Sequence, residues 1–157
     1  MRKALCNRAD NTMQDYPHHY NVIATAGPGG GVNITGNDLI VIDSAPPKEF
    51  GGPGDKWSPE TLLVASVADC FILSFRSIAK ASKLPWVSLQ CEVNGTLEHK
   101  EGTTKFTKFD IHAKLYVPED ANEDRAHHLL EKAEKTCLIT NSLLSTIHLD
   151  AVVLKEP

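Results

Sequence analysis

The chain has 157 residues, of which 41% are hydrophobic and 23% are charged, and its formal net charge is −4. This length and composition are typical of one globular domain that buries about two-thirds of the surface of its unfolded chain. The acidic balance disfavours nucleic acid and anionic membrane surfaces as partners. Residues 1–20 carry five charges and no apolar run typical of a signal peptide, so we expect a cytoplasmic protein with one domain over 1–157.

The first part of the chain predicts short strands separated by turns. Residues 1–17 are polar, and we expect an irregular arm there. The segments 20–26 and 31–35 flank a cluster of glycines and a proline, a pattern typical of a β-hairpin. A third strand is expected over 39–43, and a Pro/Gly-rich loop over 44–57 follows it. Loops of this length without secondary structure are often functional.

A central helix is expected over residues 58–81. Ser58 suits the N-cap position, Pro59 suits the first helical turn, and Glu60 places a negative charge at the positive end of the helix dipole. Residues 62–75 carry only two ionisable groups, so the helix is apolar nearly all round, which is typical of a buried helix. A membrane span takes about 20 apolar residues, and we interpret this segment as too short and too interrupted for one.

Two long strands are expected after the central helix. Polar and apolar residues alternate cleanly over 86–97, which predicts a half-buried strand. The segment 104–117 alternates as well, but Phe106 is out of phase with the apolar residues that follow it. This phase change predicts a β-bulge near Thr107.

A second helix and a closing strand are expected at the end of the chain. Asn122 suits the N-cap of a helix that runs through Thr136, with apolar residues at helical spacing. A short turn or helix over 141–145 and a strand over 147–154 follow. The expected order is β-β-β-α-β-β-α-β, which indicates the α+β class with a mostly antiparallel sheet.

The four cysteines show no CxxC spacing, which argues against a zinc ribbon or a thioredoxin motif; they are Cys6, Cys70, Cys91 and Cys137. Cys91 lies in the apolar phase of its strand and is interpreted as a core residue. Cys70 and Cys137 lie on apolar helical stripes, and the pattern leaves two interpretations open. Both are core residues, or they form a peroxidase-type pair in which one thiol becomes a sulfenic acid and the other condenses with it to a disulfide.

The ionisable neighbours of Cys70 and the histidines are further candidates for a chemical role. Asp69 would oppose thiolate formation if it faced Cys70, but adjacent helical residues point about 100° apart. We therefore expect a structural role for Asp69. No metal site is expected, because adjacent histidines such as His127 and His128 do not share a helix face.

Three runs of sequence resemble the OsmC/Ohr family of osmotically inducible and organic-hydroperoxide-resistance proteins. They are SAPPKEFGGPG at 44–54, WSPETLL at 57–63 and ADCF at 68–71. The segment TCLITNS at 136–142 is similar to the second cysteine motif of the family. The resemblance covers roughly residues 20–154.

This resemblance implies an α+β fold in which antiparallel sheets wrap around the long central helices of an intertwined homodimer. It implies a thiol-dependent peroxidase that reduces organic hydroperoxides without a cofactor, with Cys70 as the peroxidatic thiol and Cys137 as the resolving thiol. Glu60 matches the family glutamate that acts with an arginine to activate the first cysteine. The implied reductant is a dithiol, typically a lipoyl group on a partner protein in the Ohr branch.

Helix geometry constrains the role of Glu60. Glu60 and Cys70 are ten residues apart, which corresponds to about 15 Å along a continuous helix. Either the helix begins later than Ser58, or Glu60 serves a cysteine of the other chain. We predict the second arrangement, with the active sites at the subunit interface.

The chain departs from the family pattern at two positions. The family arginine lies in the first hairpin turn, but the corresponding turn, 27–31, contains no arginine. The usual proline after the second cysteine is Leu138. Arg2, Arg8 and Arg76 are the candidates to replace the arginine. The departures leave an alternative function, a redox-sensing or binding protein on the OsmC fold with little peroxidase turnover.

Overall fold

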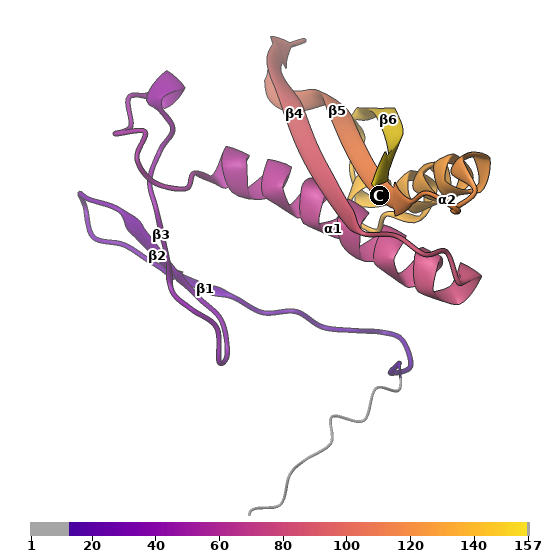
Figure 1. Cartoon of the computed structure of the whole chain (residues 1–157). Coiled ribbons are helices and arrows are strands. Elements are labelled where there is room, and N and C mark those ends of the chain that lie inside the picture. Colours follow the sequence, from indigo (N-terminus) through magenta and orange to yellow (C-terminus); the bar gives the residue numbers. More distant parts are fainter. Residues whose placement is uncertain (1–12, 157) are drawn as a thin grey trace, which may run out of the picture. The chain divides into compact units, whose positions relative to one another are not determined.

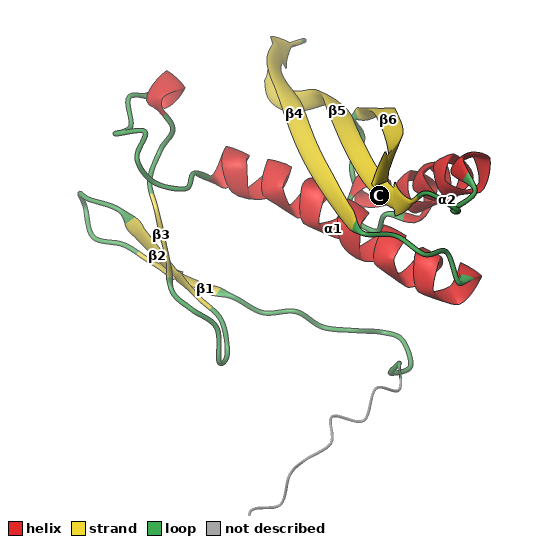
Figure 2. Cartoon of the chain, viewed as in Figure 1, coloured by secondary structure: helices red, strands yellow, loops and turns green. Residues whose placement is uncertain are grey.

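The computed structural model describes residues 13–156, so most of the arm expected over 1–17 lies outside the described residues. Residues 13–17 contain no helix or strand. The chain forms two compact units, one up to Ser44 and one from Ala45 onward, and each is described by itself. The order of helices and strands is β-β-β-α-β-β-α-β, which confirms the α+β class (Figure 2).

The first unit contains a three-stranded antiparallel sheet. Strands β1 (Ile23–Thr25) and β2 (Val32–Thr35) pair as the expected hairpin, and β3 (Ile42–Ser44) pairs with β2. The third strand was expected over 39–43, but it begins at Ile42. The reason is the turn before it, where Asp38 has a φ of 56° and residues 39–41 continue as a loop.

The second unit begins with the Pro/Gly-rich loop, which is closed by hydrogen bonds within itself. The Ala45 N–H donates to the carbonyl oxygen of Trp57 at 2.9 Å, which joins the two ends of the loop. A short 3₁₀ helix, η1 (Lys48–Phe50), lies between them. A Cβ atom at Gly52 would lie 1.6 Å from the carbonyl oxygen of Pro46, so only glycine fits this close approach.

Helix α1 (Pro59–Ser82) follows the loop and is one continuous helix. Ser58 caps it as expected, because the Ser58 hydroxyl accepts from the Thr61 N–H at 3.1 Å. The Thr61 hydroxyl in turn accepts from the Ser58 N–H at 2.8 Å, which completes a capping box. Lys83, in the left-handed conformation, ends the helix.

Only one stripe of α1 is buried within this chain. The buried residues recur every fourth position and are Val67, Phe71, Phe75 and Ala79. Leu73, on another face, is 49% exposed. The expectation of a helix buried all round is therefore wrong for the single chain. The expectation that α1 is too short for a membrane span is also wrong by length and composition, although the core helix of a soluble protein meets the same criterion.

The second sheet has the order β4-β5-β6 and contains one parallel pair. Strands β4 (Ser88–Lys100) and β5 (Thr103–Pro118) are antiparallel, whereas β5 and β6 (Thr146–Glu156) are parallel. Three of the four strand pairings in the described chain are antiparallel, as expected for a mostly antiparallel sheet. The parallel pair forms because α2, between β5 and β6, carries the chain back before β6 begins. The register of β4 and β5 shifts so that Thr107 is the extra residue, which confirms the bulge.

Helix α2 (Glu123–Thr136) begins at the expected cap, where the Asn122 side chain accepts from the Arg125 N–H at 2.8 Å. Both helices pack on one face of the β4-β5-β6 sheet (Figure 1). Alternate residues of β5 supply the centre of this core and are all buried; they are Phe109, Ile111, Ala113, Leu115 and Val117. A short 3₁₀ helix, η2 (Thr140–Ser142), connects α2 toward β6.

Candidate active site

Two cysteines from different elements of the second unit meet where α1 packs against α2. Cys70 lies near the middle of α1 and is half-buried. Cys137 is the residue that follows α2, and it is completely buried. The two side chains lie close enough for the thiol of Cys137 to lower the pKa of the Cys70 thiol through a hydrogen bond. The structure thus brings together the two thiols, a proximity that their spacing in the sequence does not determine.

The surroundings of Cys70 favour its thiolate form. Burial raises the pKa of the Cys70 thiol, but hydrogen bonds outweigh this effect and lower the pKa from its usual value. The donors come from two elements; they are the backbone N–H groups of Ile139 and Leu138, the thiol of Cys137 and the hydroxyl of Ser74. A thiolate that accepts several hydrogen bonds is the form that attacks electrophiles.

The surroundings of Cys137, in contrast, raise the pKa of its thiol. Burial is the largest cause that raises the pKa of the Cys137 thiol, and the neighbouring Cys70 raises it further. Hydrogen bonds with Thr140 lower this pKa, but they do not offset the rise. Of the two side chains, Cys70 is therefore the one whose thiolate is favoured, and Cys137 is the one whose thiol is favoured.

Cys91 is a third thiol in the same unit, and its environment makes it a poor nucleophile. It lies on β4 and packs against the hydrophobic core, in agreement with its interpretation as a core residue. Burial, followed by the nearby Cys137, raises the pKa of Cys91 to about 11. The remaining cysteine, Cys6, lies outside the described residues.

Sequence analysis missed Ser74 as a neighbour of Cys70. Its hydroxyl oxygen lies 4.0 Å from the Cys70 sulfur, and the two residues are four positions apart on α1. Residues at this spacing share a helix face, which is the signal that could have identified it. Asp69 and Arg76 are exposed, and neither is among the described groups that shift the Cys70 pKa. Arg2 and Arg8 lie outside the described residues.

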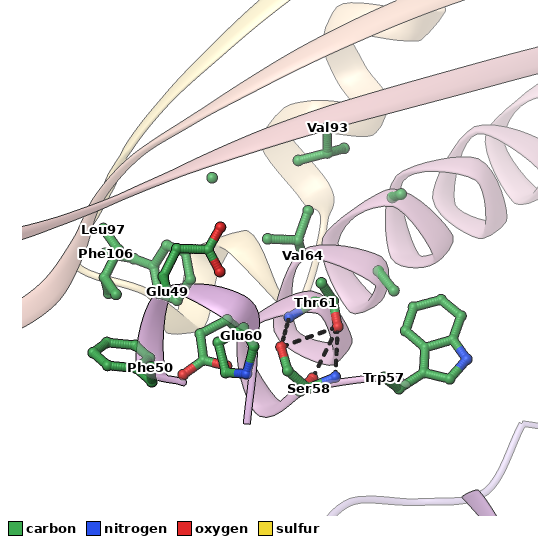
Figure 3. Close-up of a pocket in the computed structure, with 14 residues that line it drawn as sticks. Glu49, Phe50, Trp57, Ser58, Glu60, Thr61, Val64, Val93, Leu97 and Phe106 are labelled. Atoms are coloured by element: carbon green, nitrogen blue, oxygen red, sulfur yellow. Dashed lines mark hydrogen bonds between the residues drawn. The ribbon is translucent and has the colours of Figure 1, made fainter. Parts of the chain in front are cut away.

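Glu60 lines a cavity of about 540 Å³ at the start of α1 (Figure 3). One of its carboxylate oxygens, Oε2, is buried and has no hydrogen-bond partner among the described residues. Glu49 supplies a second carboxylate, and most other lining residues are apolar; they include Phe50, Trp57, Val64, Val93, Leu97 and Phe106. The cavity therefore combines an apolar wall with a carboxylate that lacks a partner.

The structure does not bring Glu60 and Cys70 together within one chain. Helix α1 begins at Pro59 and is unbroken, so a later start of the helix is excluded. The two residues are thus separated by ten positions of continuous helix, or about 15 Å. Within the part of the chain that the structure describes, no group of three or more His, Cys, Asp or Glu side chains is arranged to hold a metal ion.

The comparisons with known proteins agree with this fold. Residues 52–151 match the family model for OsmC-like proteins. The chain belongs to the OsmC-like family. Glu60, Cys70 and Cys137 all lie inside the matched segment of the family model.

The OsmC-like fold is also seen in solved structures. An OsmC-like protein of unknown function from Vibrio cholerae superposes with a TM-score of 0.80 at 16% identity, covering 87% of this chain and 100% of that one. An organic hydroperoxide resistance protein from Legionella pneumophila, also described as a predicted redox protein, gives a TM-score of 0.68 at 26% identity, covering 87% and 98%. The Bacillus subtilis protein YmaD, itself uncharacterized, is 26% identical over 136 residues, covering 84% of this chain and 91% of its own.

Proposed function

We propose that this OsmC-like protein is a thiol-dependent peroxidase that reduces organic hydroperoxides, with Cys70 as the peroxidatic thiol and Cys137 as the resolving thiol. The observation that carries the proposal is the meeting of Cys70 and Cys137 where α1 packs against α2, with the pKa of Cys70 lowered and that of Cys137 raised. Similarity to the Legionella pneumophila protein described as an organic hydroperoxide resistance protein supports the same activity.

The proposed reaction has two chemical steps. The Cys70 thiolate attacks the terminal oxygen of ROOH, the O–O bond breaks, and the alkoxide leaves and takes a proton to give ROH, while Cys70 becomes a sulfenic acid. The Cys137 sulfur then attacks the sulfenic sulfur, which forms the Cys70–Cys137 disulfide and releases water. A dithiol reductant, such as a lipoyl group on a partner protein, regenerates both thiols by thiol–disulfide exchange.

An apolar organic group is the substrate feature that the cavity favours. Its wall is formed largely by aromatic and aliphatic side chains, and Ala65 and Ala68 extend the lining along α1 toward Cys70. Burial of an alkyl or aryl group against such a wall is favourable by about 25 cal/mol per Å² of apolar area. We therefore propose alkyl or aryl hydroperoxides as substrates in preference to hydrogen peroxide, in the cytoplasm.

We further propose that the working form is an intertwined homodimer with the active sites at the subunit interface. Two features of the single chain support a second copy. Helix α1 exposes apolar surface outside its buried stripe, including Leu73. Among the described residues, Glu60 Oε2 is buried without a hydrogen-bond partner, an arrangement that costs about 1–3 kcal/mol unless another group completes it. Glu60 of one chain would then serve Cys70 of the other.

The proposed chemistry is tested by adding one equivalent of cumene hydroperoxide to the reduced protein. Thiols are counted before and after, and the bridged peptides are mapped by mass spectrometry. We expect the loss of two thiols per chain and a Cys70–Cys137 disulfide. The Cys137→Ser variant is expected to react once, stop at the sulfenic acid and fail to turn over with a dithiol. An unchanged thiol count in the wild-type protein would contradict the peroxidase function.

A redox-sensing or binding protein on the same fold is the second candidate. The observation that favours it is the absence of an arginine in the first hairpin turn, residues 27–31, where the family pattern has one. This candidate predicts stoichiometric oxidation of the pair but no sustained consumption of peroxide with lipoyl or thioredoxin-type dithiols. Steady-state assays with both reductants separate it from the peroxidase.

A further inference from the structure

We propose that Gly95 determines the size of the organic group that the cavity beside Glu60 accepts, and that the room it leaves beside Phe106 admits an aryl ring. This role of Gly95 rests on the proposed peroxidase function, because it concerns the organic group R of the hydroperoxide ROOH. The reacting thiols are not involved, so the role is the same whether the peroxide reacts with Cys70 of the same chain or of the other.

Gly95 lies on β4, the strand that packs against helix α1. It lines the cavity of about 540 Å³, a volume within the range typical of small-molecule sites. A Cβ atom at this position would lie 2.8 Å from Val64 Cγ2 and 2.9 Å from Phe106 Cε1. Both distances are shorter than ordinary contacts between carbon atoms, which are about 3.5–4.0 Å. A glycine inside a strand often marks such a close approach, and here it leaves space open between α1 and β5.

The neighbours of Gly95 are restrained and do not easily make room for a side chain. Val64 lies within α1, where a β-branched side chain has one strongly preferred rotamer. The ring of Phe106 stacks on the buried ring of Phe109, with 5.2 Å between the ring centroids and 25° between the planes. The carbonyl oxygen of Phe106 accepts from the Ser145 hydroxyl at 2.8 Å. A carbon atom added at Gly95 would therefore take its space from the cavity.

The β-bulge in β5 places Phe106 beside Gly95. Thr107 is the extra residue of this bulge. Without it, strict alternation would put Phe106 and Phe109 on opposite faces of the sheet. The extra residue returns Phe106 to the face that packs against α1, where its side chain lines the cavity. The Thr107 hydroxyl donates to the Glu98 carboxylate, which stabilises the bulge.

The rest of the cavity wall suits an aromatic ring. Aromatic side chains from three parts of the described chain line the cavity, namely Phe50 of η1, Trp57 before α1 and Phe106 of β5 (Figure 3). Aromatic rings attract one another when they pack edge to face or offset face to face, beyond the effect of the buried area alone. An aryl group is larger than a tert-butyl group, so it depends more strongly on the room that Gly95 leaves.

The test uses the alcohols that correspond to two hydroperoxides, so that binding is measured without a redox step. The larger probe is 2-phenylpropan-2-ol, the product from cumene hydroperoxide, and the smaller is 2-methylpropan-2-ol, the product from tert-butyl hydroperoxide. Binding to the reduced protein is followed by NMR through the indole N–H signal of Trp57, which lines the cavity. The other tryptophan, Trp86, packs edge-on against Phe75 with 5.5 Å between the ring centroids and is the internal reference.

We expect Gly95→Ala to weaken the binding of 2-phenylpropan-2-ol about tenfold, the effect of one carbon atom in an apolar pocket. The affinity for the smaller alcohol should change less. Adding Val64→Ala to Gly95→Ala removes the methyl group nearest the new Cβ atom and should restore most of the lost affinity. Asn94→Ala is the matched control, because Asn94 is the preceding residue of β4 and is exposed on the opposite face of the sheet. Circular dichroism establishes that each variant is folded.

The outcomes separate the role of Gly95 from the proposed function. If the wild-type protein binds neither alcohol, or if Gly95→Ala changes the affinity for both alcohols equally or not at all, the role of Gly95 is overturned. That result holds even if cumene hydroperoxide still forms the Cys70–Cys137 disulfide. If the size preference shifts as expected but the wild-type protein forms no disulfide, size selection by the cavity stands and the peroxidase function fails.

Discussion

Cys70 and Glu60 both lie on α1, but their surroundings differ. The described chain supplies hydrogen-bonding groups to Cys70 and none to Glu60 Oε2. Around Cys70, donors from α1 and from the segment after α2 surround the sulfur and lower its pKa. Around Glu60, at the start of the same helix, a buried carboxylate oxygen has no partner among the described residues and faces a cavity of about 540 Å³. The surroundings of Cys70 are thus supplied by its own chain, whereas Glu60 Oε2 has no hydrogen-bond partner in the described part of that chain.

A thiolate and a buried carboxylate need different surroundings. The stabilisation of a thiolate needs only short-range donors, which adjacent helices supply through local geometry. A buried carboxylate needs a cation or several donors to offset its desolvation, and the described part of the chain provides none to Glu60 Oε2. We therefore expect variants near Cys70 to act within one chain and variants at Glu60 to act between chains.

The largest expected effect is at Cys70 itself. Cys70→Ala should reduce the consumption of cumene hydroperoxide to the uncatalysed background, because the attacking sulfur is absent. The matched control is Cys91→Ala, which removes a thiol whose pKa is raised to about 11 and which is therefore protonated at neutral pH. Peroxidase assays with a dithiol reductant measure both. Substantial loss of activity in Cys91→Ala would contradict the assignment of the reaction to Cys70 and Cys137.

Glu60→Gln comes next and tests the incomplete half of the site. It keeps the shape of the side chain and removes its charge, and we expect kcat/KM to fall about a hundredfold, the typical cost of losing one electrostatic contact to the reacting groups. Circular dichroism establishes that the variant is folded. Glu49→Gln, which alters the exposed carboxylate of the same cavity, is the control and should leave the rate unchanged.

A mixed dimer tests whether Glu60 serves Cys70 of its own chain or of the opposite chain. One chain carries Cys70→Ala and the other carries Glu60→Gln, each with its own affinity tag so that the heterodimer can be purified. If Glu60 serves the cysteine of the opposite chain, one of the two symmetric sites is intact and about half of the wild-type activity returns. Activity no higher than that of the Glu60→Gln homodimer would show that Glu60 serves its own chain.

The smallest expected effect concerns alkaline stability. Cys91 keeps its proton in the folded chain up to about pH 11, from an ordinary value of 9.0, whereas the unfolded chain loses it earlier. Unfolding in this window therefore releases a proton, and a rise in pH lowers the free energy of unfolding by up to about 1.4 kcal/mol per pH unit. Urea unfolding between pH 8 and pH 11 should show a shallower loss of stability in Cys91→Ala than in wild type.

Local patterns of sequence predicted most of the fold. The capping residues Ser58 and Asn122, the alternation of the two long strands and the bulge at Thr107 all depend on neighbours within a few residues, and all are confirmed. The parallel pairing of β5 and β6 was not anticipated, since strand direction depends on how the α2 connection returns to the sheet. The late start of β3 reflects the turn at Asp38, whose extent the residue types did not define.

The sequence by itself determined which residues are candidates for the proposed chemistry, because the cysteines, Glu60 and the family motifs are present in the chain regardless of how it folds. Only the tertiary structure decided that Cys70 lies beside Cys137, that the Ser74 hydroxyl lies 4.0 Å from the Cys70 sulfur, and that Glu60 Oε2 has no hydrogen-bond partner among the described residues. The physical reason is that the pKa of a thiol depends on burial and on donors from elements distant in sequence. These donors meet only when α1 packs against α2.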